Sequence, residues 1–65
     1  MWTVGKKYNC VWADWVLILH AKTNGDYVAI DSREEVHIIH PERFVFDEDG
    51  NQILLKEMLV ELHNG

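Results

Sequence analysis

The sequence predicts one small domain that is mainly β or α+β, with a curled antiparallel sheet of four or five short strands and a C-terminal helix. Turn residues divide the chain at short intervals, which is typical of a small antiparallel β protein. The segments between the turns are rich in β-branched and aromatic residues, and only the last segment changes to a helical period. The 65 residues form a single domain, residues 1–65.

The first two predicted strands are Lys7 to Trp12 and Trp15 to Ala21, and Ala13-Asp14 separates them. The second strand contains the run Trp-Val-Leu-Ile-Leu, which is apolar at every position. A strand with two apolar faces is typically buried on both sides. We therefore expect this strand to be central in the sheet or to lie under the C-terminal segment.

Asn24-Gly25 is the strongest turn signal in the chain, because both residues tolerate the positive φ angles of a tight hairpin. It predicts that a third strand, Tyr27 to Asp31, pairs with the strand before it. A polar turn, residues 32–35, then leads to a fourth strand from Val36 to His40.

Pro41 ends the fourth strand, since it cannot donate a ladder hydrogen bond, and a short strand from Phe44 to Phe46 follows one tight turn. This order of short strands, with the turn His40-Pro41-Glu42-Arg43-Phe44 before the last one, resembles the ending of an SH3-like small barrel. The resemblance is one of pattern and covers Gly5 to Phe46. The acidic, aromatic-rich first loop of peptide-binding SH3 domains is missing. The group hosts many unrelated functions, so the resemblance implies a fold and no particular activity.

The last segment, Ile53 to His63, has a helical period. Its apolar residues fall on one stripe of a helix: Leu54, Leu55, Met58, Leu59 and Leu62. In an alternative interpretation, Ile53 to Leu55 is a strand that pairs with Phe44 to Phe46 across Asp49-Gly50. The pattern after Lys56 fits a strand less well, so we favour a short strand or turn followed by a helix.

Composition and charge argue against several classes of protein. Eleven acidic residues against six basic ones give a net charge of −5, whereas nucleic-acid binding needs clustered lysine and arginine. The longest apolar run is too short to span a bilayer, so we expect a soluble protein with no membrane contact. Cys10 is the only cysteine, so no internal disulfide can form, and a reducing, cytoplasmic location fits best.

No motif carries catalytic or metal-binding chemistry at a recognisable spacing. His37 and His40 would point to opposite faces of a strand. The loop Asp47 to Asn51 departs from the calcium-loop pattern, since aligning Gly50 puts Lys56 where a glutamate ligand is required. There is also no glycine-rich phosphate loop. We therefore predict a protein that is not an enzyme and that uses no cofactor and no metal.

The sequence favours a protein–protein interaction module, with a homodimer as one form of that contact. The apolar fraction of 48% is generous for a chain of this length, so some apolar surface should meet a partner. The candidate contact residues come from the aromatic cluster, the predicted helix and an acidic turn: Trp12, Trp15, Tyr27, Met58, Leu59, Asp47, Glu48 and Asp49.

Two alternatives stay open. In the first, the chain is a small acidic inhibitor or regulator, of viral or mobile-element type, that docks on a nucleic-acid-binding protein through Asp47 to Asp49. Such binding would depend strongly on salt. In the second, an aromatic face binds a small ligand or nucleic acid. Stacking of that kind works with positive charge, which is sparse here and includes Lys6, Lys7, Lys22, Arg33 and Arg43.

Overall fold

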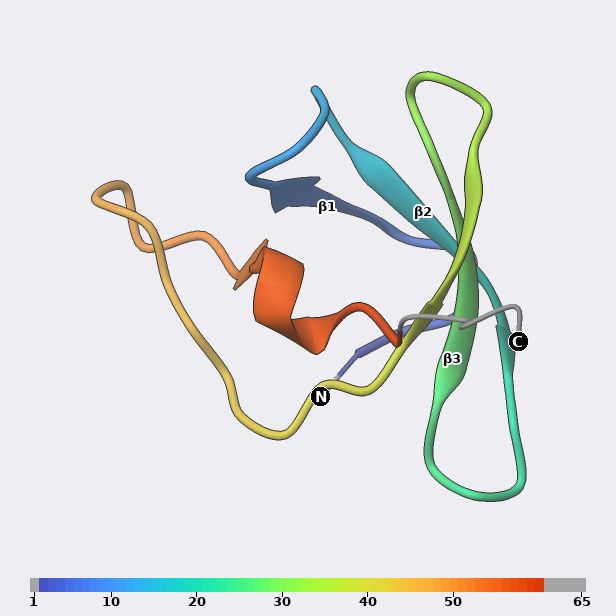
Figure 1. The fold of residues 1–65 in the computed structure, drawn as a ribbon. Coiled ribbons are helices and arrows are strands. Elements are labelled where there is room, and N and C mark those ends of the chain that lie inside the picture. The colour runs from blue at the N-terminus through green and yellow to red at the C-terminus, as the bar shows by residue number, and fades with distance from the viewer. Residues whose placement is uncertain (1, 61–65) are drawn as a thin grey trace.

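Five short strands form one curled sheet, a half-barrel, in the computed structural model, which describes residues 2–60 (Figure 1). The order across the sheet is β4-β3-β2-β1-β5. The mainly β class is confirmed, and the first four strands lie within two residues of their predicted bounds. The strands are β1 (Lys7–Cys10), β2 (Val16–Ala21), β3 (Tyr27–Asp31), β4 (Val36–Ile39) and β5 (Ile53–Leu54).

The sheet is mixed, which corrects the prediction of a wholly antiparallel one. β1 to β4 pair antiparallel in sequence order, whereas β5 lies parallel to β1, with Asn9 opposite Ile53. A parallel neighbour requires a crossover connection. Here that connection includes β2, β3 and β4, and its last part, residues 40–52, swings away from the sheet after β4 and returns beside β1 (Figure 1). The strand predicted for Phe44 to Phe46 is reduced to a single bridge between Phe46 and Gln52.

The C-terminal helix predicted for Ile53 to His63 is not formed in the described part of that segment. β5 is followed by one 3-10 turn, η1 (Lys56–Met58), and the backbone at Leu59 is extended. Residues 61–63 of the predicted helix lie outside the described residues.

The backbone N–H and C=O groups of this segment form hydrogen bonds with the edges of neighbouring strands. In a helix, they would have bonded to each other. The N–H of Val60 donates to the carbonyl of Ile38 at 2.8 Å, and the N–H of His40 donates to the carbonyl of Met58 at 2.7 Å. These bonds attach the segment to the outer edge of β4, while β5 at its start pairs with β1. One short stretch of chain thus contacts β1 and β4, the two outer strands of the antiparallel part of the sheet, and holds the curl.

The core fills the concave side of the sheet, where η1 lies inside the curl (Figure 1). Alternate residues of each strand point to this side, as the two-residue period of a strand requires. All five strands, Trp2 and η1 contribute buried side chains: Trp2, Tyr8, Cys10, Val16, Ile18, Ala29, Ile39, Leu54 and Met58.

The predicted hairpin at Asn24-Gly25 is confirmed. Gly25 has a φ of +93°, and the side-chain oxygen of Asn24 accepts the N–H of Asp26 at 3.1 Å. Asp26 also bonds through its carboxylate to Nδ1 of His40, just after β4. The hydrogen bond and the charge of Asp26 raise the pKa of His40, and the bond to His40 lowers the pKa of Asp26. This pair ties the hairpin to the end of β4.

We expect His40→Ala to lower the melting temperature most at acidic pH. A histidine whose pKa is raised on folding stabilises the fold fully below its unfolded value of 6.5, and this contribution is lost as the pH rises through the folded pKa. Thermal unfolding measures the melting temperatures of His40→Ala and the unmodified protein from about pH 5 to about pH 8. The difference between the two melting temperatures should become smaller as the pH rises. His20→Ala, at an exposed histidine of β2, is the control. A difference that stays constant across this range would contradict the prediction.

Met58→Ala should reduce the free energy of unfolding by about 2–3 kcal/mol, because it empties a buried site against the concave face. Lys56→Ala, an exposed position in the same 3-10 turn, should cost less than about 0.5 kcal/mol. Urea denaturation measures both. Equal effects at the two positions would mean that η1 does not pack into the core.

Candidate functional site

Asp31, at the end of β3, is the only polar or charged residue among residues 2–60 that is fully buried. Its Oδ1 accepts the backbone N–H of Arg33 at 2.8 Å and that of Glu35 at 3.0 Å. Its Oδ2 accepts the indole N–H of Trp12 at 3.2 Å and lies 2.7 Å from Nε2 of His37. Both carboxylate oxygens therefore have two partners each.

These bonds keep Asp31 ionised. Burial alone would raise its pKa, but the hydrogen bonds from His37 and from the N–H groups of Glu35 and Arg33 favour the charged form and lower the pKa to about 2. The guanidinium of Arg33 adds a positive charge 3.7 Å from Asp31 and 3.5 Å from the carboxylate of Glu35. The negative charge inside the fold is thus balanced locally.

The Asp31 cluster joins three parts of the chain. Asp31 holds the turn between β3 and β4 through the two backbone N–H groups, and the N–H of Asp31 itself donates to the carbonyl of Glu35 at 2.9 Å. Trp12, in the loop after β1, packs its ring edge-on against His37 of β4 at 5.6 Å between centroids. The cluster therefore fixes the Trp12 loop against the β3–β4 turn.

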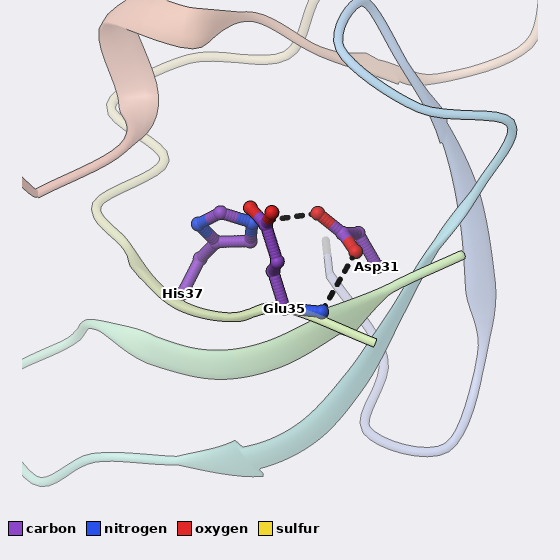
Figure 2. A group of neighbouring side chains, drawn as sticks. All are labelled: Asp31, Glu35 and His37. Atoms are coloured by element: carbon purple, nitrogen blue, oxygen red, sulfur yellow. Dashed lines mark hydrogen bonds and ion pairs between the residues drawn. The ribbon is translucent and has the colours of Figure 1, made fainter. Parts of the chain in front are cut away.

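Asp31, Glu35 and His37 also bring three potential metal-ligand atoms within 4.8 Å of one another (Figure 2). Carboxylate oxygens and imidazole nitrogens are ordinary ligands of divalent metals. Here, however, the nitrogen of His37 that faces the group is already bonded to Asp31, and Arg33 lies close to both carboxylates as a cation. The contacts of this group are those of a complete ion-pair network that organises a turn.

The sequence gives only part of the signal for this cluster. In the segment Asp31-Ser32-Arg33-Glu34-Glu35, an aspartate precedes a polar turn, and such residues commonly bond to backbone N–H groups a few positions ahead. The approach of Trp12 and His37 depends on pairing between distant strands, so sequence reasoning missed the cluster.

The structure does not bring the sequence-predicted contact residues together. Trp12 and Tyr27 are half-buried and pack against the core. Trp15 is half-buried, and the ammonium group of Lys7 lies 4.1 Å from the centroid of its ring. Met58 belongs to the core, and Leu59 packs at its margin, where it forms a bridge to β4.

The acidic turn lies apart from these residues, between Phe46 and Gln52. Asp47 organises it by accepting the N–H groups of Asp49 and Asn51, both at 2.9 Å. These backbone bonds, that of Asn51 foremost, lower the pKa of Asp47. Glu48 and Asp49 are exposed.

The convex side of the sheet carries a continuous apolar surface, which we call the outer face. Its residues alternate with the core residues along β2, β3 and β4, so they point away from the core. One row crosses the sheet from Leu17 through Ile30 to Val36, and a second joins Val28 to Ile38. The outer face consists of Trp15, Leu17, Leu19, Val28, Ile30, Val36 and Ile38.

Two members of the outer face are strongly exposed, Val36 at 62% and Leu19 at 45%, and the others are half-buried. β2 is central in the sheet, as predicted from its two apolar faces. The described part of the C-terminal segment lies on the opposite, concave side, so it does not cover this face. A signal for the outer face was present in the sequence, because the outward positions of β3 and β4 are all apolar: Val28, Ile30, Val36 and Ile38.

Comparison with protein-family models, with curated protein sequences and with solved structures gives no significant match to this chain. Among the described residues, no helix has the length and apolar character needed to cross a membrane.

We expect Asp31→Asn to destabilise the fold by about 2 kcal/mol at neutral pH, because an amide nitrogen must then face a donor and the charge is lost. The pKa of Asp31 is depressed on folding, so its contribution is present above the unfolded value of 3.8 and lost as the pH falls toward about 2.

Urea denaturation at neutral and acidic pH tests this, with Asp49→Asn at an exposed position as the matched control. The difference between Asp31→Asn and the unmodified protein should shrink below pH 3.8. A neutral-pH effect no larger than that of the control would refute a stabilising role for the cluster.

Proposed function

We propose that this chain is a non-enzymatic protein–protein interaction module that contacts its partner through the outer face. The observation that carries the proposal is the exposure of branched apolar side chains on adjacent strands of so small a domain. Contiguous apolar surface of this kind marks interaction sites in soluble proteins. Trp15 adds an aromatic side chain of the type that often anchors such contacts.

Two further features support a binding role over a catalytic one. The Asp31 cluster is satisfied by its own members, so its carboxylate is not free to act as a base. Cys10, the only thiol, is buried and donates to the carbonyl of Ala13 at 3.4 Å. A buried, free thiol also fits our proposal of a reducing, cytoplasmic setting.

A photo-crosslinking amino acid at position 36 tests the proposal in cells of the source organism. It should give a covalent adduct with a protein, identified by mass spectrometry, because Val36 is exposed on the outer face. Position 11 is the matched control, since Val11 is also an exposed valine (51%) but lies just beyond β1 next to β5, where its N–H donates to the carbonyl of Leu54. Equal labelling at positions 36 and 11, or no adduct at position 36, would refute the assignment of this face.

The same crosslinking experiment also tests the alternative hypothesis, in which the chain is an acidic inhibitor or regulator that docks through Asp47 to Asp49. A crosslinker at position 49, in the exposed acidic turn, reports on a partner that docks there. An adduct at position 49 without one at position 36 would support the acidic inhibitor or regulator in place of the outer-face module. Its formation should then fall with increasing salt, because exposed charges are screened.

A further inference from the structure

We propose that Asn24 is a site of self-modification, at which the side-chain amide becomes a carboxylate with release of ammonia, and that Asp26 and His40 promote this reaction. Asn24 is exposed in the turn between β2 and β3, and Gly25 follows it. The site shares no residue with the outer face, so the inference goes beyond the proposed function and does not depend on it.

The group that attacks the Asn24 amide is the backbone nitrogen of Gly25. Glycine has no side chain to shield this nitrogen. Apart from its chain neighbours, no heavy atom of the described residues lies within 4 Å of the position that a Cβ would take at Gly25. The Oδ1 of Asn24 accepts the N–H of Asp26 at 3.1 Å, and this bond folds the Asn24 side chain over the backbone of Gly25. The amide carbon is thereby held close to the attacking nitrogen.

Asp26 contacts both polar atoms of the Asn24 amide. Its N–H donates to Oδ1, which becomes negative when the nitrogen attacks, and a donor in that position stabilises the new charge. Its Oδ2 accepts from Nδ2, the nitrogen that leaves, at 3.2 Å. Its Oδ1 contacts Nδ1 of His40. One carboxylate thus connects the imidazole to the leaving group.

The reaction consumes only water. The nitrogen of Gly25, whose N–H now donates to the carbonyl of Lys22 at 3.2 Å, loses its proton to solvent and forms a bond to Cγ of Asn24. The bond from Cγ to Nδ2 then breaks, and its electron pair leaves with ammonia. The proton that ammonia takes comes from His40 through the carboxylate of Asp26, and His40 regains it from solvent. Water opens the resulting cyclic imide at either carbonyl, which gives aspartate or isoaspartate.

The product changes the hairpin. A carboxylate replaces the Nδ2 donor of Asn24 opposite the carboxylate of Asp26, and the net charge goes from −5 to −6 (−5 − 1). Two like charges at this separation repel each other. Isoaspartate also adds a backbone atom to the turn, whose length sets the register between β2 and β3. We therefore expect the modified chain to have a lower melting temperature than the unmodified chain.

The charges around His40 set the pH dependence of the reaction. They come from the hairpin, from the loop after β4 and from η1: Lys22, Asp26, Glu42, Arg43 and Glu57. Arg43 and Glu57 pair with each other at 2.6 Å, and Glu42 lies 3.9 Å from Nε2 of His40. Asp26 raises the pKa of His40 above 6.5. The proton supply is therefore present below the raised pKa and is lost as the pH rises through it.

Peptide mapping by mass spectrometry, after incubation of the intact chain from about pH 6 to about pH 9, tests the inference. His40→Gln keeps an N–H donor near Asp26 but has no titratable proton. Loss of Asn24 should be about tenfold slower in His40→Gln than in the unmodified chain at about pH 6. The ratio of the two rates should decrease as the pH rises, and circular dichroism establishes that both proteins are folded.

Two other asparagines serve as internal controls. Asn51 is also exposed, but Gln52 follows it, so its conversion should be much slower than that of Asn24. Asn64 precedes Gly65 outside the described residues and repeats the dipeptide, and its rate should be the same in both proteins. If His40 only held the hairpin closed, His40→Gln would speed up the loss of Asn24. That result, equal rates at Asn24, or retention of Asn24 in an unmodified chain that loses Asn64 would overturn the inference.

Discussion

The fold depends on the backbone pairing of residues 53–60 with β1 and β4, the two outer strands of the antiparallel part of the sheet. β5 lies against β1, and the chain just beyond η1 bonds to the edge of β4 at Ile38 and His40. Without these bonds the concave side would be open, and Leu54 and Met58 would leave the core. A chain of 65 residues buries a modest share of its surface, so each buried side chain matters to its stability. Closure of the curl is thus what makes the core possible.

The Asp31 cluster adds a second constraint at the turn between β3 and β4, the opposite end of β4 from its bonds to the C-terminal segment. A buried carboxylate is costly unless hydrogen bonds and opposite charge compensate for lost hydration. Here, backbone N–H groups, Trp12 and His37 compensate together, and they come from separate parts of the chain. Because the buried carboxylate of Asp31 needs the indole N–H of Trp12 as a donor, it specifies one position for the Trp12 loop. It also sets the geometry of the turn that leads into β4, which carries Val36 and Ile38 of the outer face.

The sequence predicts what local chemistry decides. The Asn24-Gly25 hairpin and the first four strands follow from turn residues and β-branched runs. The end of the chain does not, because Leu54 and Met58 are spaced four apart, which places both on one side of a helix. A strand followed by a 3-10 turn buries the same two residues, and only contact with β1 and β4 decides between these structures. The Asp31 cluster could not be predicted from the sequence either, since its members meet only through the pairing of distant strands.

The sheet buries a charged residue on one side and exposes apolar residues on the other. A buried carboxylate lies on the concave side, while branched apolar residues such as Val36 are exposed on the convex side. The core accounts for one apolar side of β2, β3 and β4, but packing within the described chain gives no reason for the other. Exposed apolar area favours association, and a net charge of −5 opposes it wherever carboxylates would meet. The outward side of β1 to β4 carries no carboxylate, so repulsion between carboxylates does not oppose the contact of a partner with the outer face.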